Sequence, residues 1–152
     1  IPLPSLTSNH SNVMRMGFIN MPREMLPFMD ALCDRFQEIS KLLYCPSGKP
    51  ILNNLPNSCS VNYYRNGNDY INWHADNEQK SYISNPIYSI SLGDERTFQL
   101  RNEDTGRITD IKLSNGSLLI MYGDQLQLKY KHRVPKTNSE IGRLNLTFRF
   151  YE

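Results

Sequence analysis

The sequence lacks several features that mark special classes of protein. None of its 152 residues belong to an apolar run near the roughly 18 residues that a membrane span needs, so no transmembrane segment is predicted. The opening ten residues also lack the basic and then apolar layout of a signal peptide. The chain starts at Ile1 and not at a methionine, so we expect a domain excised from a longer protein.

Cysteine is also scarce. Cys33, Cys45 and Cys59 form no C-x-x-C pair, and three thiols cannot make a closed set of disulfides. We expect buried structural thiols in a cytoplasmic, reducing compartment. Histidine occurs only at His10, His74 and His132, so few combinations could bind a metal.

The composition indicates one globular domain. Aromatic residues reach 11% and the net charge is only +2, which argues against disorder. A chain of 152 residues can bury most of the surface that its unfolded form exposes, but it is too short for two full domains. The slight excess of basic residues permits a polyanionic partner without requiring one. We expect a monomer, although the sequence does not fix the oligomeric state.

The order of the predicted elements suggests an α+β fold that is mainly β. Residues 25–43 carry apolar side chains at the three-four spacing of a helix, and breakers follow at residues 45–48. Short strands separated by turn signals such as Asn66-Gly67 then cover residues 60–65, 70–73, 87–92, 96–101, 107–113, 117–122 and 143–151. One helix followed by so many strands predicts a sandwich or jelly roll with the N-terminal helix packed on it.

The last predicted strand has two chemically different faces. Period-two alternation places Leu144, Leu146, Phe148 and Phe150 on one side and Arg143, Asn145, Thr147 and Arg149 on the other. The polar face could simply meet water, as in many half-buried strands. It could instead line the mouth of a barrel, where guanidinium groups suit a small dicarboxylate.

A second pattern lies in the middle of the chain. His74 and Asp76 are two residues apart, so they share a side if the segment is extended, and His132 follows much later. Two imidazoles and a carboxylate on one face of a metal leave the opposite positions open, as in non-heme Fe(II) oxygenases. The His-x-Asp pair alone is a weak signal, because short motifs often match by chance. The order of the whole set is more specific: Asn62-x-Tyr64, then His74-x-Asp76-x-Glu78, a distant His132, and Arg143-x-Asn145-x-Thr147-x-Arg149.

This compound motif resembles the AlkB family of Fe(II)/2-oxoglutarate-dependent dioxygenases over about residues 61–150. The resemblance implies a double-stranded β-helix, or jelly roll, with iron at one mouth. It implies that His74, Asp76 and His132 bind Fe(II), and that 2-oxoglutarate is held by Asn62, Tyr64, Arg143, Asn145 and Arg149. Glu78 matches the acidic position that faces the target base. Residues 125–134 are similar, more narrowly, to AlkB domains within replicase polyproteins of plant RNA viruses.

The resemblance also sets the expected domain layout. Residues 1–57 would form an N-terminal extension with the helix and a shortened nucleotide lid, and residues 58–152 the catalytic jelly roll. Only about sixty residues precede Asn62, fewer than is usual in the family, so the substrate range is the property placed in doubt. Lys131 and Arg133 lie in a basic cluster around His132 and could contact phosphates, although a solvated loop explains them equally well.

The leading functional hypothesis is an oxidative demethylase of alkylated nucleic acid bases. It would remove N-linked methyl groups, as in 1-methyladenine and 3-methylcytosine, from single-stranded RNA and also DNA, releasing formaldehyde and consuming O2 and 2-oxoglutarate. A base inside a duplex must first be flipped out to reach such a site. Two alternatives stay open: a hydroxylase or demethylase of the same class acting on a protein or lipid, and a non-catalytic jelly-roll module that binds ligand or RNA.

Overall fold

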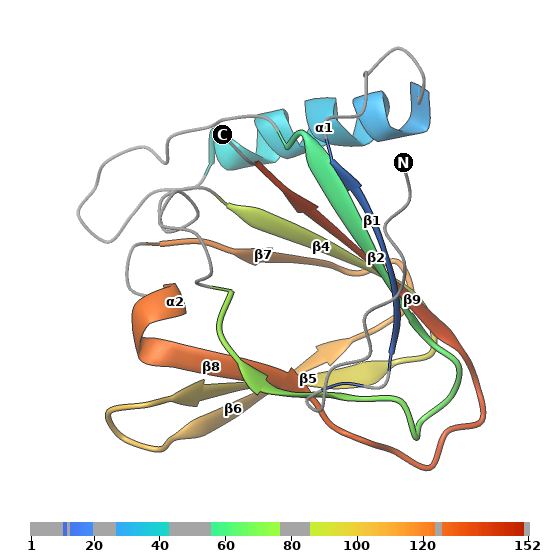
Figure 1. Ribbon diagram of the computed structural model, residues 1–152. Coiled ribbons are helices and arrows are strands. Elements are labelled where there is room, and N and C mark those ends of the chain that lie inside the picture. Colours follow the sequence, from blue (N-terminus) through green and yellow to red (C-terminus); the bar gives the residue numbers. More distant parts are fainter. Residues whose placement is uncertain are drawn as a thin grey trace.

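Two antiparallel β-sheets face each other in the computed structural model of this chain (Figure 1). The structure describes residues 11, 13–19, 27–42, 56–76, 86–123 and 126–150. The larger sheet has the order β1-β2-β9-β4-β7, and the smaller sheet has the order β3-β8-β5-β6. Neighbouring strands are mostly distant in sequence, so the chain crosses repeatedly between the sheets. This is the arrangement of a jelly roll.

The element bounds follow the chain in order. They are β1 (Met14–Ile19), α1 (Pro27–Ser40), β2 (Ser58–Tyr64), β3 (Ile71–His74), β4 (Ile87–Gly93), β5 (Arg96–Asn102), β6 (Ile108–Leu113), β7 (Leu118–Met121), α2 (Leu126–Lys129), β8 (Tyr130–Val134) and β9 (Arg143–Arg149).

The outer face of the larger sheet is covered by α1, at the top in Figure 1. Phe36 of this helix is buried and stacks on Tyr88 of β4, with ring centroids 4.4 Å apart. It also meets the edge of Phe148 of β9 at 5.1 Å. Burying three large rings in one contact removes much apolar surface from water, which fixes the helix to the sheet.

A second apolar cluster fills the space between the sheets. Its buried members come from both layers and include Ile71, Phe98 and Val134 of the smaller sheet and Ile87 and Met121 of the larger one. The cluster does not fill the interior completely, because polar side chains of β9 and β4 also point inward. The apolar core therefore borders a polar cavity between the two sheets.

Most of the elements predicted from sequence are confirmed, and the fold is mainly β with one long helix. Three short elements lie outside the predicted helix and strands: β1, α2 and β8. The turn at Asn66-Gly67 is present, but the strands on its two sides belong to different sheets. The turn instead joins residues 137–139, because Gly67 N donates to Ser139 O at 2.6 Å and Thr137 N donates to Gly67 O at 2.8 Å.

The structure also bears on the cysteines, on membrane spans and on the expected domain boundary. Cys33 and Cys59 are buried and form no disulfide among the described residues, whereas Cys45 lies outside them. In the part of the chain that the structure describes, no helix is long and apolar enough to cross a membrane. The boundary expected between residues 57 and 58 falls just before β2, and β1 pairs with β2 across it along six residues.

Candidate metal centre

A cavity of about 250 Å³ opens between the two sheets. The larger sheet contributes mainly polar side chains to its wall, and the smaller sheet contributes mainly apolar ones together with two histidines. The lining from the larger sheet includes Ser60, Asn62, Tyr64, Ser89, Arg143, Asn145, Thr147 and Arg149, and that from the smaller sheet Ile71, His74, Phe98, Leu113, His132 and Val134. A concave site with a few convergent polar groups is the usual form of a small-ligand pocket.

A β-bulge in β3 turns His74 into this cavity. Ile71 and His74 both line the wall, but they are three residues apart, and a regular strand puts only residues at even spacing on one face. The register with β8 shifts between these two residues, so the strand carries an extra residue there. The bulge thus lets both side chains point inward and places His74 opposite His132 of β8.

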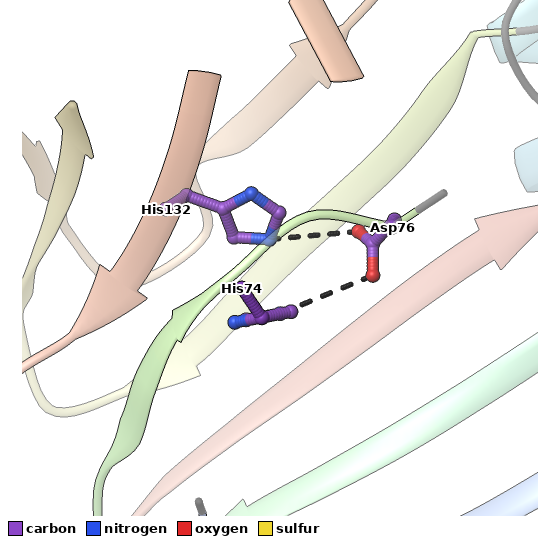
Figure 2. Close-up of side chains that lie close together, drawn as sticks. All are labelled: His74, Asp76 and His132. Atoms are coloured by element: carbon purple, nitrogen blue, oxygen red, sulfur yellow. Dashed lines mark ion pairs between the residues drawn. The ribbon is translucent and has the colours of Figure 1, made fainter. Parts of the chain in front are cut away.

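His74, Asp76 and His132 converge at one end of the cavity (Figure 2). One ligand atom from each residue lies within 4.8 Å of the others. Asp76 Oδ1 is 3.9 Å from His74 Nε2, and Asp76 Oδ2 is 3.5 Å from His132 Nε2. The predicted grouping of these three residues is therefore present, although they come from two strands and the loop after β3.

The second ring nitrogen of His74, Nδ1, contacts a backbone carbonyl that the sequence could not identify. His74 Nδ1 lies 2.8 Å from the backbone carbonyl of Asn72, which is part of the bulge. Because a carbonyl only accepts, Nδ1 is the donor in this contact, and in a neutral imidazole Nε2 would then keep its lone pair. This is the tautomer that a metal-binding histidine needs.

The protonation states in the cluster also suit a cation. Burial lowers the pKa of His132 to about 4, so its imidazole is neutral near pH 7. For Asp76, burial opposes ionisation, but Arg149, His132 and His74 outweigh it, and the net pKa lies below its usual value. Neutral imidazole and ionised carboxylate are the forms that bind a divalent metal.

The other end of the cavity is dominated by Arg143, whose guanidinium is buried. Its Nη2 donates to Ser91 Oγ at 2.9 Å, and its plane lies over the Tyr64 ring, 4.8 Å from the centroid. Its Nε and Nη1 have no hydrogen-bond partner, and no salt bridge to Arg143 occurs among the described residues. Burial lowers its pKa, yet a guanidinium keeps its charge. A buried cation with unused donors is costly unless an anion binds beside it.

Arg149 connects this polar wall to the metal cluster. Its Nη2 lies 3.1 Å from Asp76 Oδ2, and its buried Nε has no hydrogen-bond partner. Asn62 Oδ1 is likewise buried and unsatisfied. The cavity therefore carries unused polar atoms at both ends, as expected of a site for a small molecule with two acidic groups.

Asn145 differs from its neighbours because its amide is fully engaged. Its Nδ2 donates to Ser89 Oγ at 2.7 Å and to Ile90 O at 3.1 Å. Its Oδ1 accepts from Asn62 Nδ2 at 3.3 Å and from Thr147 Oγ1 at 3.0 Å. This geometry suits a residue that orients Asn62 better than one that contacts a ligand directly.

The residues predicted for the site have three different outcomes in the structure. All eight residues predicted for metal or co-substrate binding line the cavity: Asn62, Tyr64, His74, Asp76, His132, Arg143, Asn145 and Arg149. Glu78 lies outside the described residues. Lys131 and Arg133 flank His132 in β8, so they lie on the opposite face of the sheet, away from the cavity.

Sequence reasoning missed three contributors. Ser89 and Ser91 hold Asn145 and Arg143, and Phe98 stacks on the His132 ring with centroids 5.1 Å apart. The two serines had a readable signal, because they alternate with Tyr88, Ile90 and Leu92 in β4. Phe98 had none, since its role depends on the pairing of β5 with β8.

The sequence of this chain is similar to those of known proteins. Residues 7–149 match the model of the 2OG-Fe(II) oxygenase superfamily. Human alpha-ketoglutarate-dependent dioxygenase alkB homolog 3 is 42% identical over 103 residues, which cover 61% of this chain and 36% of that protein. Human DNA oxidative demethylase ALKBH2 is 32% identical over 142 residues, covering 88% of this chain and 49% of that protein. The chain thus spans about a third to a half of the length of these relatives.

Two solved structures share the fold. OsALKBH1 superposes with a TM-score of 0.69 at 18% identity, covering 97% of this chain and 83% of the other. A Pseudomonas putida prolyl-4-hydroxylase gives a TM-score of 0.60 at 16% identity, covering 99% and 78%. These likenesses confirm the predicted jelly roll.

Proposed function

This chain belongs to the 2OG-Fe(II) oxygenase superfamily, and from that premise we propose that it oxidatively demethylates alkylated nucleic acid bases. The net reaction converts an N-methyl base, O2 and 2-oxoglutarate into the free base, formaldehyde, succinate and CO2. The observation that supports it most directly is one cavity with a His-Asp-His cluster at one end and, at the other, a buried arginine with two unused donors. The likeness to alkB homolog 3 and ALKBH2 supports the choice of nucleic acid as substrate.

Fe(II) is the cofactor of the superfamily, and the cluster of His74, Asp76 and His132 fits it. The three ligand atoms lie close enough together to share one ion, and the acidic member is ionised while the buried histidine is neutral. Three protein ligands on one side leave the opposite positions open for other molecules. Bound iron supplies the oxidising power that breaks a C–H bond of the methyl group.

The co-substrate 2-oxoglutarate fits the rest of the cavity. The unused Nε and Nη1 donors of Arg143 match the two oxygens of its distal carboxylate. Arg149, which contacts Asp76, lies at the metal end, where the other acidic group would bind. Tyr64 and Asn62 complete the wall, while Asn145 orients Asn62. In this assignment the larger sheet holds the co-substrate, and the smaller sheet provides both histidine ligands.

The substrate assignment rests on three further residues. We propose Glu78 as the acidic group facing the target base and Lys131 and Arg133 as phosphate contacts, with methylated single-stranded RNA or DNA as the partner. A single strand is preferred because its base can enter the cavity without the free-energy cost of unpairing. Lys131 and Arg133 would then bind the phosphates of the nucleic acid on the outer face of β8.

Formaldehyde release tests this proposal. Purified protein with Fe(II) and 2-oxoglutarate should release formaldehyde from 1-methyladenine or 3-methylcytosine in single-stranded RNA or DNA, more than from the same lesion in a duplex. The Glu78→Ala variant should lose activity on the base while it still consumes 2-oxoglutarate in the uncoupled reaction. Inactivity on every nucleic acid, with 2-oxoglutarate consumption intact, would instead favour a protein or lipid target.

A further inference from the structure

A stack of three side chains lies on the outer face of the smaller sheet, directly behind the metal cluster. The guanidinium of Arg133 in β8 and that of Arg101 in β5 each lie 4.5 Å from the centroid of the Trp73 indole in β3. In the sheet order, β8 lies between β3 and β5. One aromatic ring from the edge strand therefore reaches across β8 to contact the third strand.

The strand that carries Trp73 is an edge strand that pairs with β8, and an isolated bridge joins its Ile71 to Ser11. β3 has four residues, and its Cα register with β8 contains two partner pairs, Ile71 with Val134 and His74 with His132. The bulge lies between these pairs, where it interrupts the ladder. The same bulge turns His74 into the cavity and supplies the Asn72 carbonyl that contacts its Nδ1. The orientation of His74 thus depends on a locally weakened part of the sheet.

The stack joins the two histidine-bearing strands at the residues adjacent to the ligands. Trp73 precedes His74, and Arg133 follows His132, so the stack and the ligands occupy opposite faces of the same backbone. Both arginines are held in turn by the smaller sheet. Arg133 Nε donates to Gln99 Oε1 at 2.6 Å, and Arg101 Nε donates to Glu103 Oε1 at 2.7 Å.

We propose that Trp73 is a positioning residue for the metal centre and acts through its stack on Arg101 and Arg133. The stack holds the bulged β3 against β8 and so keeps His74 and His132 facing the same ion. This role rests on the proposed metal site, but it assigns a function to residues that touch neither metal nor co-substrate. It also explains why a large aromatic group lies on the face of β3 that points away from the cavity.

Cobalt(II) binding to the metal-free protein tests the proposal without reference to turnover. Co(II) absorbs in the visible range, and its spectrum reports the geometry of its ligands. Trp73→Ala should weaken Co(II) binding roughly tenfold, as the loss of groups that orient metal ligands commonly does, and should change the spectrum. Trp73→Phe keeps an aromatic face and should restore most of the affinity. Wild-type affinity and spectrum in Trp73→Ala would overturn the proposal.

A second pair of variants decides the matter if Trp73→Ala does not fold. Arg101→Ala removes one stacking partner and should weaken Co(II) binding several-fold. Arg107→Ala is the matched control, because it removes an exposed arginine from the same β5–β6 hairpin and should bind Co(II) like the wild type. Equal affinity in both variants would overturn the proposal. Failure of the wild type to bind Co(II), or full binding by His74→Ala, would instead refute the metal site itself.

Discussion

The two sheets of this protein turn opposite chemistry toward the same cavity. The larger sheet lines the cavity mainly with polar side chains, of which Arg143, Asn145 and Thr147 are all buried, whereas its outer face carries apolar residues. The side chains with which the smaller sheet lines the cavity are apolar except for His74 and His132. Alternation along a strand separates its two faces but does not reveal which one points toward the other sheet, and in β9 it is the polar face.

Because polar side chains of the larger sheet point inward, some of its apolar side chains are exposed on the outer surface. Leu144, Leu92 and Tyr63 are neighbours on three adjacent strands of the larger sheet, and each is 38–40% exposed. Helix α1 covers the part of this outer face near Phe148 and Tyr88. Burying polar side chains while apolar ones stay exposed costs free energy of folding. Ligand binding by the buried polar side chains accounts for this arrangement. We therefore expect mutations in the two sheets to impair different properties, metal binding for the smaller sheet and 2-oxoglutarate binding for the larger one.

The largest effect is expected at Asp76, where the sheets meet. Its carboxylate faces both histidines of the smaller sheet and accepts from Arg149 of the larger one. Asp76→Asn keeps the shape but removes the charge, so turnover with Fe(II) and 2-oxoglutarate should fall below detection. Asp110→Asn, which removes a carboxylate that accepts from Gln99 on the outer side, is the control and should keep its activity. Comparable turnover in the two variants would contradict the assignment.

The next effect concerns the larger sheet alone. Arg143→Met should raise the 2-oxoglutarate concentration needed for half-maximal rate by at least roughly thirtyfold, because losing one partner of a buried charge pair costs about 2 kcal/mol or more. The same change should not lower the ligand-free Tm, since it removes a buried guanidinium with unused donors. Co-substrate titration and thermal unfolding measure the two quantities. An unchanged dependence on 2-oxoglutarate would remove Arg143 from the site.

Two phenylalanines sharpen the comparison through stability. Phe36 belongs to α1 and packs on the outer face of the larger sheet, whereas Phe98 packs on the inner face of the smaller sheet against His132. Replacing either by alanine should lower the free energy of unfolding by about 3–5 kcal/mol. Only Phe98→Ala should also weaken Co(II) binding under conditions where the protein stays folded. If both variants bind the ion equally, the Phe98 contact does not orient His132.

The smallest effect is expected from pH. The folded pKa of His132, about 4, lies below its ordinary value of 6.5, so between these values the unfolded chain binds a proton that the folded protein does not. The metal-free protein should therefore lose stability as pH falls from about 6.5 toward 4, by at most a few kcal/mol, since one pKa unit is about 1.4 kcal/mol. Denaturant unfolding of the wild type and of His132→Asn should show this slope in the wild type and a shallower slope in the variant. Equal slopes would contradict the low pKa.

Much of the fold and site could be predicted because the informative residues lie at regular spacing. The alternation of Arg143, Asn145 and Arg149, and the pairs Asn62-x-Tyr64 and His74-x-Asp76, set the faces of their segments correctly. The resemblance to the AlkB family is confirmed by the relatives that the chain matches. The substrate contacts and the origin from a polyprotein stay predictions.

What sequence could not supply depends on pairing between distant strands. β8 was missed because its residues Tyr130–Val134 are mostly polar and resemble a loop, although His132 and Val134 face the core. The bulge was missed because nothing in Ile71–His74 marks an extra residue. Arg96 is buried at 1% exposure and donates to the carbonyls of Asp69 and Pro135, a role that only the assembled turns reveal.

The most direct test of this account is an anaerobic titration with Fe(II) and 2-oxoglutarate. If the smaller sheet supplies the metal ligands and the larger sheet the carboxylate site, the wild type should develop a weak visible charge-transfer band that needs both additions. His74→Ala should abolish the band, and Arg143→Met should shift it to much higher 2-oxoglutarate concentrations. A wild-type protein that gives no band with both present would contradict the assignment of this cavity as an oxygenase site.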